Sequence, residues 1–259
     1  LIEQAPLFYR ILFPETVWRL HRKRRTVFLT FDDGPIPEVT PWGLDVLDKY
    51  GIKATFFMVG DNIRKHPEVF EMVKARGHRL GNHTFNHIGG LRHGITSYLN
   101  NVDKANEYWH TDLFRPPHGW MKWDQYVFVK RRYKVVMWDL VTRDYSTRLN
   151  GRDVLLNVRR FARPGSIITF HDSVKSHDKL LYALPRAIEW LLSQGYSFKV
   201  FDEPQPHPTG ELRYNKVSVS YTHSDAADDL TRVDLGGRRI IKKKKKKTTK
   251  HKQSHEREK

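Results

Sequence analysis

Acidic and imidazole side chains stand in this sequence where short apolar runs end. Asp32 and Asp33 follow one such run, His83 and His87 follow another, and His171 follows a third. If these runs are parallel strands of a β/α fold, their carboxyl ends meet at one rim, which is where such folds place their active sites. So many polar groups on one rim are better explained by chemistry than by packing.

The residue types at this rim suit a divalent metal. Asp33, His83 and His87 make a set of one carboxylate and two imidazoles that leaves a coordination position open, as in catalytic zinc sites. The two histidines are four residues apart, so on a helical turn both rings would face the same way. No Glu follows the first histidine, which excludes the zincin motif. Taken alone, the histidine pair is more often just two surface histidines, and two adjacent carboxylates also occur in a turn or at a helix N-cap.

Four neighbouring residues could complete a hydrolytic site. Asp32 could take a proton from metal-activated water, and His171 titrates near neutral pH and could act as a general acid. Arg115 could orient a carboxylate through two parallel hydrogen bonds. The stiff pair Pro116–Pro117 would hold the backbone N–H of His118 in a fixed direction, where it could stabilise an oxyanion. A buried core position is the alternative for His171.

The elements that must carry these residues alternate along the chain. Apolar, β-branched runs alternate with stretches of helical spacing, which predicts a parallel sheet with helices outside. Seven such units in about 180 residues favour a distorted (β/α)7 barrel of the α/β class over an open sheet. The expected strands are 26–31, 54–59, 78–81, 112–115, 134–139, 166–170 and 198–201, and the expected helices are 41–50, 69–77, 95–109, 152–161 and 180–194.

Composition predicts three segments in the 259 residues: an N-terminal segment 1–25, a catalytic barrel 26–203, and a polar, lysine-rich tail 204–259. Much of the net charge of +17 lies in the last 22 residues, which hold 12 Lys and Arg against two Glu and include six successive lysines, 242–247. Such a block repels itself and is predicted to be disordered. Polyanion binding is the functional alternative for it.

Further exclusions come from what the chain lacks. It contains no cysteine, which excludes disulfides and thiolate chemistry. No apolar run has the roughly 18 residues that a membrane span needs. The opening residues lack the apolar core of a signal peptide, although the chain begins with Leu rather than Met. We expect a soluble protein, and the sequence leaves open whether it works in the bacterial cytoplasm or the cell envelope, and in which oligomeric state.

The polar motifs, in this order, resemble those of the polysaccharide deacetylases (NodB-homology domain, carbohydrate esterase family 4). The resemblance covers residues 25–202, and its first two motifs are specific. The matching stretches are Thr-Phe-Asp-Asp-Gly-Pro at 30–35, Gly-Asn-His-Thr-Phe-Asn-His at 81–87, Arg-Pro-Pro-His at 115–118, residues 138–145, and Ile-Thr-Phe-His-Asp at 168–172.

The resemblance implies a distorted (β/α)7 barrel that removes acetyl groups, chiefly N-acetyl, from an amino-sugar glycan by metal-activated water. It implies a divalent cofactor, zinc in the first place, with cobalt, nickel or manganese as alternatives. By position, it implies Asp33, His83 and His87 as metal ligands, Asp32 as general base, Arg115 as the residue that holds Asp32, the His118 backbone N–H as an oxyanion donor, and His171 as general acid.

This chain departs from the family pattern at two motifs. The third motif ends in His118 where an aromatic residue is usual, which changes the surface that meets the sugar. In the fourth, Val141 stands at the first Asp and Tyr145 replaces Trp, while Asp144 is kept. Either Asp139 or Asp144 could tune His171. A catalytically weakened relative that binds glycan without turnover is therefore the alternative function.

Substrate contacts are predicted from position. Trp120 and Trp123 directly follow the Arg115 motif, and sugar faces stack on aromatic rings, although loop packing explains them equally well. Thr169, two residues before His171, is expected to contact substrate as well. We expect an acetylated glycan as partner and no obligate nucleic acid. A nucleic-acid or anionic-surface protein led by the lysine block is the remaining alternative.

Overall fold

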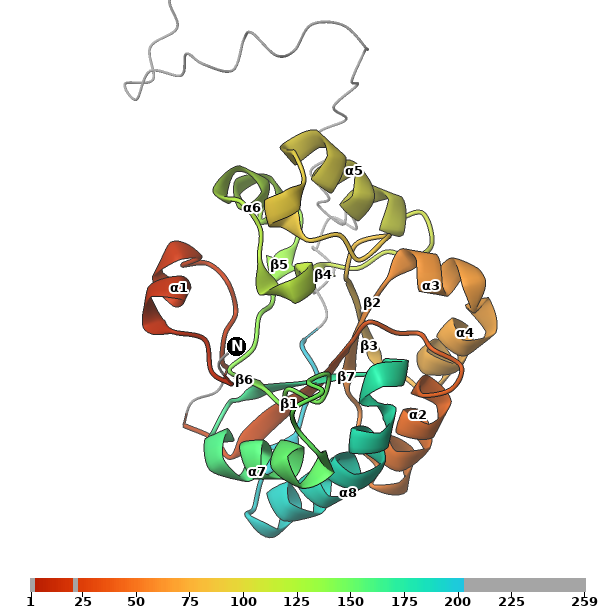
Figure 1. The fold of residues 1–259 in the computed structure, drawn as a ribbon, viewed down its shortest axis with the longest axis vertical. Helices are drawn as coiled ribbons and strands as arrows, with labels where there is room; N and C mark the ends of the chain where they lie inside the picture. Colours follow the sequence, from red (N-terminus) through yellow and green to blue (C-terminus); the bar gives the residue numbers. More distant parts are fainter. Residues whose placement is uncertain (1–2, 21–22, 203–259) are drawn as a thin grey trace, which may run out of the picture. The chain divides into compact units, whose positions relative to one another are not determined.

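The computed structural model describes residues 3–20 and 23–202, which form an α/β fold around one curled sheet (Figure 1). The predicted tail, 204–259, lies outside the described residues. The strands are β1 (Thr26–Asp32), β2 (Thr55–Met58), β3 (Arg79–Asn82), β4 (Leu113–Phe114), β5 (Lys134–Val135), β6 (Leu140–Val141), β7 (Ile167–His171) and β8 (Ser197–Phe198). The α-helices are α1 (Leu7–Leu12), α2 (Thr40–Lys49), α3 (Gly60–Lys65), α4 (Pro67–Ala75), α5 (Ile95–Ala105), α6 (Trp123–Val129), α7 (Gly151–Phe161) and α8 (His177–Ser193), and the 3₁₀ turns are η1 (Gly90–Arg92), η2 (Pro117–Gly119) and η3 (Val174–Ser176).

The described strands pair in parallel in the order β5-β4-β3-β2-β1-β7-β6, with β8 added beside β1. The register sets Asp32 at the end of β1 directly beside His171 at the end of β7. Because every strand of a parallel sheet points the same way, their carboxyl ends form one rim. The predicted distorted (β/α)7 barrel is confirmed.

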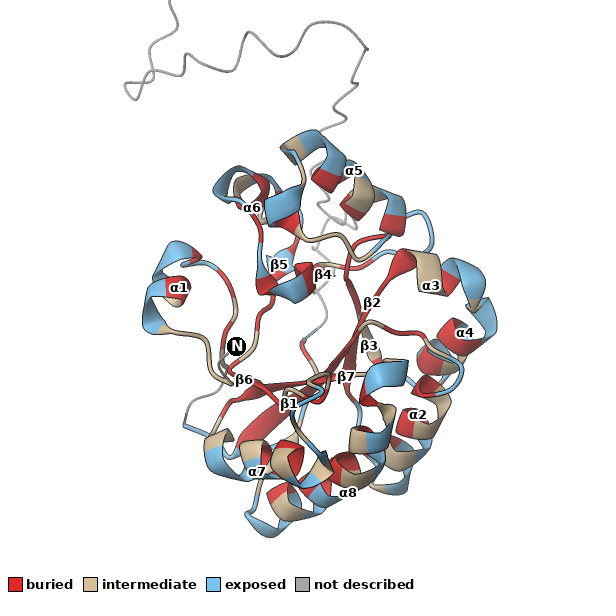
Figure 2. Cartoon of the chain, viewed as in Figure 1, coloured by how far each residue is buried: buried red, intermediate tan, exposed pale blue. Residues whose placement is uncertain are grey.

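Helices cover the outer face of the sheet, and most strand residues are buried beneath them (Figure 2). Strand β1 is buried along its whole length, as expected for a parallel strand covered on both sides. Helix α8 turns one apolar stripe inward, with Leu184, Ile188 and Leu191 fully buried in the core that it shares with β1 and β7. This packing fixes the strand ends on which the polar residues stand.

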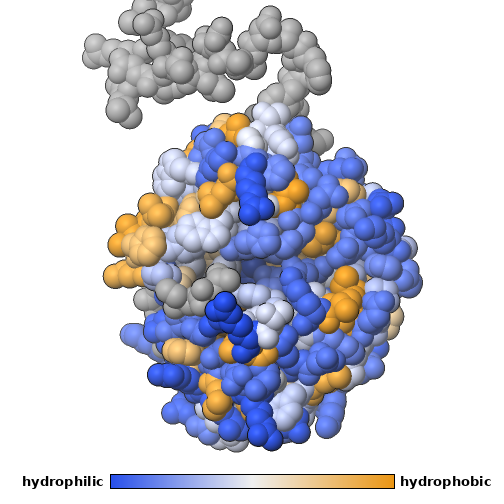
Figure 3. Space-filling view, viewed as in Figure 1, coloured by the Kyte–Doolittle hydropathy of each residue, from blue (hydrophilic) through white to orange (hydrophobic). Residues whose placement is uncertain are grey.

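The N-terminal segment lies in the interval between β5 and β6, the two ends of the strand order. The Val17 N–H donates to the Val135 carbonyl at 2.9 Å, and the Val17 carbonyl accepts from Met137 at 2.9 Å. Helix α1 precedes Val17 in the chain and buries Tyr9 in the core beside β5. Its other side exposes four apolar side chains, which form the orange patch at the left of Figure 3. These four are Leu7, Phe8, Ile11 and Leu12. The segment therefore contributes hydrogen bonds and core side chains to the barrel.

The observed elements differ locally from the predicted ones for two reasons. The strand predicted over 134–139 is shorter, since after Val135 the backbone leaves β4 and turns to Val17. Helices α3 and α6 were not predicted; they have six and seven residues, too few to show a clear 3.6-residue period. Within the described residues, no helix is long and apolar enough to cross a membrane.

Candidate active site

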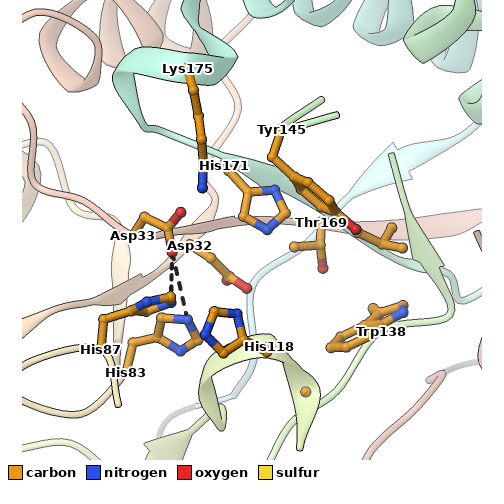
Figure 4. Close-up of a pocket in the computed structure, with 12 residues that line it drawn as sticks. Asp32, Asp33, His83, His87, His118, Trp138, Tyr145, Thr169, His171 and Lys175 are labelled. Atoms are coloured by element: carbon orange, nitrogen blue, oxygen red, sulfur yellow. Dashed lines mark ion pairs between the residues drawn. The ribbon is translucent and has the colours of Figure 1, made fainter. Parts of the chain in front are cut away.

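A cavity of about 140 Å³ opens at the carboxyl end of the strands (Figure 4). It gathers predicted residues from β1, β7 and the loops after β3 and β4, segments far apart in the sequence. The residues that line it are Asp32, Asp33, His83, His87, His118, Gly119, Trp138, Val141, Tyr145, Thr169, His171 and Lys175. The rim expected from the sequence is thus one continuous concave site.

The three predicted metal ligands converge at one side of this cavity. Their candidate ligand atoms lie within 4.8 Å of one another, with Asp33 Oδ1 3.1 Å from His87 Nε2 and 3.8 Å from His83 Nε2. His83 Nδ1 lies 2.7 Å from the Arg115 carbonyl oxygen, so it carries the proton and leaves the Nε2 lone pair facing Asp33. One carboxylate and two imidazoles at this separation fit a divalent cation such as zinc.

The charge states suit ligation as well. Burial, and then the nearby His87, lowers the pKa of His83 well below its usual value, so the ring is neutral at neutral pH. Burial alone would raise the pKa of Asp33. The hydrogen bond with His87 and the neighbouring imidazoles outweigh it and hold this pKa below its usual value, so Asp33 is ionised. A neutral imidazole and a carboxylate are the forms that bind metal.

His83 and His87 do not lie on a helical turn, the arrangement in which a spacing of four would make both rings face the same way. They lie on an irregular loop in which Thr84 and His87 have positive φ values of 65° and 55°. Asn82 and Asn101 hold this loop through hydrogen bonds to the backbone N–H groups of Thr84 and Phe85, each within 2.9 Å. The rings meet because these amides satisfy the loop backbone, and not because of helical periodicity.

Asp32 is held by a fully buried arginine. Arg115 Nη1 lies 2.6 Å from Asp32 Oδ1, and the guanidinium lies over the Phe57 ring, 4.1 Å from its centroid. The expected pair of parallel hydrogen bonds does not form: Nε and Nη2 instead donate to the carbonyls of Val136 and Met137. Burial raises the pKa of Asp32 although the arginine acts to lower it. The carboxylate is therefore fixed in place and made more basic than usual.

His171 is paired with Asp144, the retained aspartate of the fourth motif. His171 Nδ1 lies 2.7 Å from Asp144 Oδ1, and its backbone N–H donates to Oδ2 at 2.7 Å. Burial alone would lower the pKa of His171, but the charge and hydrogen bond of Asp144 outweigh it and raise the pKa to about 9. Asp139 lies elsewhere, bound by Arg163 at 2.6 Å. Asp144 is thus the carboxylate that faces His171.

Asp172 stood out in the sequence only as the neighbour of His171, but its side chain holds the turn of the first motif in place. Its carboxylate accepts from the Gly34 N–H at 3.0 Å and from the Thr40 hydroxyl at 2.7 Å. Burial raises its pKa to about 8. It joins β7 to the turn after β1, so the turn that carries Asp33 cannot shift independently of β7.

The predicted substrate tryptophans do not line the cavity. Trp120 packs on Tyr9 with ring centroids 4.2 Å apart, and Trp123 packs on Tyr126 at 5.4 Å. Both rings stay partly exposed outside the cavity, and Tyr9, beside Trp120, donates its hydroxyl to the Gly119 carbonyl. Neither residue lines this cavity, and their contact with a sugar stays a prediction.

Other side chains form the walls instead. Trp138 and Tyr145 line the cavity, and Trp138 Nε1 is buried without a hydrogen-bond partner among the described residues. Thr169 also lines it, with its hydroxyl 3.0 Å from that of Thr30. His118 contributes its ring, 4.8 Å from that of His87, and adopts a positive φ of 59°. Trp138 and Tyr145 flank Asp144 in the fourth motif, and that position was the signal available in the sequence.

Comparison with known proteins gives this geometry its family. Residues 19–132 match the family model described as polysaccharide deacetylase. The chain is 31% identical to a peptidoglycan-N-acetylglucosamine deacetylase of Bacillus cereus over 193 residues, which is 72% of this chain and 91% of that protein. It is 30% identical to a chitooligosaccharide deacetylase of Azorhizobium caulinodans over 163 residues, 60% of this chain and 77% of that one.

Solved structures agree with the sequence relatives. The structure of the Bc1960 peptidoglycan N-acetylglucosamine deacetylase matches with a TM-score of 0.70 and 27% identity, over 76% of this chain and 95% of that one. A protein of Bacillus anthracis described as a pseudoenzyme of carbohydrate esterase family 4 matches with a TM-score of 0.64 and 25% identity, over 71% and 66%. The chain belongs to the polysaccharide deacetylase family. It is a metal-dependent carbohydrate deacetylase, which acts on carbon–nitrogen bonds other than peptide bonds.

Proposed function

We propose that this chain hydrolyses the N-acetyl groups of a peptidoglycan-type amino-sugar polymer with zinc held by Asp33, His83 and His87. The observation that carries the proposal is the meeting of this ligand set with Asp32 and His171 in one cavity. A bound divalent cation would supply Lewis acidity, which polarises the acetyl carbonyl and makes water a stronger nucleophile. Zinc suits a set of two imidazoles and one carboxylate.

The chain's own residues move the protons. Asp32 accepts a proton as water oxygen bonds to the acetyl carbon, because its raised pKa makes it a better base and Arg115 prevents it from turning away. The backbone N–H of His118 donates to the oxyanion of the tetrahedral intermediate. His171 then gives its proton to the sugar nitrogen as the carbon–nitrogen bond breaks, and acetate and a free amine leave.

The polymer and the place of action are proposed from the relatives and the charge. The relatives reported above are named for peptidoglycan and for chitooligosaccharide. Residues 1–203, without the lysine-rich tail, hold 31 Lys and Arg against 22 Asp and Glu, and this positive excess favours an anionic polymer over a neutral one. We therefore place the activity at the bacterial cell envelope. Acetate release from purified peptidoglycan, compared with chito-oligosaccharides of equal length, is the direct test.

Asp32→Asn separates catalysis from binding. We expect turnover to fall by about 10²- to 10⁴-fold, the usual contribution of a general base, while one zinc per chain is retained. Asp33→Asn is the matched control and should lose zinc as well as activity. Acetate assays and metal analysis of the purified variants provide both readouts.

The same measurements distinguish the proposed hydrolase from the non-catalytic alternative. If zinc-loaded wild type releases no acetate from any acetylated amino-sugar glycan, the chain only binds glycan. If Asp32→Asn loses its zinc, Asp32 is a ligand and the assigned roles are wrong.

A further inference from the structure

Lys175 lies between two neighbouring cavities at the protein surface. It belongs to η3, directly after the His171 motif, and its side chain reaches toward Asp33 and His171 (Figure 4). It lines the catalytic cavity and also a second cavity of about 290 Å³ that adjoins it. The second cavity is polar, with Asp61, Asn62, Asn86 and Ser173 among its lining. A substrate sugar beyond the reacting one could lie there, within reach of the Lys175 ammonium.

The carboxylates that line these two cavities already have cationic partners or are committed to the metal site. Asp32 is held by Arg115 at 2.6 Å, and Asp61 is held by Lys65 at 2.6 Å. Asp33 faces the two ligand histidines. The Lys175 side chain, by contrast, forms no hydrogen bond or ion pair with any residue in the described ranges 3–20 and 23–202. A cation bound by Asp33 would also repel the Lys175 ammonium. An anion that pairs with Lys175 must therefore come from a bound molecule and not from these carboxylates.

We propose that Lys175 binds a carboxylate of the substrate, carried by the sugar next to the one that is deacetylated, and that it makes the enzyme prefer an acidic amino-sugar glycan. The lactyl group of a muramoyl residue that carries no peptide has this chemistry, whereas chitin has no such group. An ammonium on a flexible stem can meet a carboxylate whose position varies from one repeat to the next. This inference rests on the proposed function and names the feature of the substrate that it recognises.

The test compares three oligosaccharides of equal length. One alternates N-acetylglucosamine with N-acetylmuramic acid, the second is its lactyl methyl ester, and the third is a chito-oligosaccharide. Acetate release is measured with zinc-loaded wild type, Lys175→Gln and the control Lys134→Gln, an exposed lysine at the start of β5, the end of the strands opposite the cavity. Calorimetric binding of the same three ligands to Asp32→Asn, with and without Lys175→Gln, gives a readout that needs no turnover.

We expect Lys175→Gln to raise KM for the acidic oligosaccharide about tenfold, with kcat little changed, and to leave the ester and the chito-oligosaccharide unaffected. Wild type should lose the same factor on the ester, and Lys134→Gln should match wild type. Equal loss on all three ligands, or no loss on the acidic one, overturns the inference. If nothing is turned over but binding still distinguishes acid from ester through Lys175, the proposed function fails and the recognition of the carboxylate stands.

Discussion

His171 and Asp144 show how two buried side chains set a proton donor for alkaline conditions. With Asp144 ionised beside it, His171 has a pKa of about 9 and is protonated throughout the neutral range. Because the general acid works only while protonated, we expect kcat/KM to fall as the pH rises through about 9. Asp144→Asn removes the largest of the charges that raise this pKa and leaves burial, which lowers it, so the pKa of His171 should fall.

The fall in kcat/KM of Asp144→Asn should therefore begin at a lower pH than in wild type. The pH profile of kcat/KM for both proteins measures this shift. Asp178→Asn, an exposed position at the start of α8, serves as control and should keep the wild-type profile. An alkaline fall at the same pH in Asp144→Asn would show that His171 is not the group that titrates.

Residue type was enough to predict the chemical roles of single residues, but not which side chains lie in contact with one another. One aspartate and two histidines suggested a metal site because few other functions need that combination, and the three residues do converge. The sugar-facing aromatics could not be chosen in the same way. Trp120 and Trp138 look alike in sequence, and only the tertiary structure decides that the first packs on Tyr9 outside the cavity and the second lines it.

At the scale of elements, the turn between β1 and α2 depends on a residue without a side chain. A Cβ at Gly34 would lie 2.1 Å from Asp172 Oδ2, the carboxylate that accepts the Gly34 N–H. We expect Gly34→Ala to lower the free energy of unfolding by about 1–3 kcal/mol, since the carboxylate must move from its donors. Zinc affinity should fall too, because Asp33 precedes Gly34. Urea unfolding and metal titration measure both effects.

Gly43 provides the matched comparison within the next helix. A Cβ there would meet nothing within 4 Å, and the residue lies inside α2. Gly43→Ala should raise the free energy of unfolding by about 0.5–1 kcal/mol, the usual gain from alanine in a helix. If the two substitutions changed stability alike, the close packing of Gly34 on Asp172 would not be what constrains this turn.

The alternation of strands and helices could be predicted because each long element repeats its own period many times. Strand β1 and helices α2, α7 and α8 begin and end within a few residues of their expected bounds. Helix α6 could not be predicted in this way, because seven residues cover only two turns. The loop that carries His83 and His87 could not be predicted either, since its shape is set by amides of Asn82 and Asn101.

At the scale of the molecule, the N-terminal segment acts as part of the barrel. It gives Val17 to the backbone hydrogen bonds beside β5, and its Glu3 pairs with Arg143 at 2.7 Å, next to Asp144. Tyr9, Phe13 and Trp18 are buried in the core beside α6. We propose that the folding unit spans residues 1–203, wider than the catalytic barrel of 26–203, and that the lysine-rich stretch 204–259 is dispensable for fold and activity.

Two truncations test these boundaries. A chain of residues 1–203 should keep the Tm and the acetate release of the full chain. A chain of 26–203 should melt at least about 10 °C lower or fail to stay in solution, because each lost core side chain contributes about 1.5–3 kcal/mol. Scanning calorimetry provides the comparison. An unchanged Tm for 26–203 would make the N-terminal segment an appendage, and a lower one for 1–203 would assign the lysine-rich stretch a structural role.

The sequence by itself determined the alternation of strands and helices, the order of the polar motifs and the kinds of side chain at their ends. Hydrophobic periodicity and residue type are local properties, so they can be read without knowing what lies opposite. Only the tertiary structure decided that Asp144 rather than Asp139 faces His171, that Trp138 rather than Trp120 lines the cavity, and that Lys175 lies there with no ion pair to any described residue. Each of these depends on which distant segments pack together. The free energy of packing depends on both contacting segments, so it cannot be derived from either segment alone.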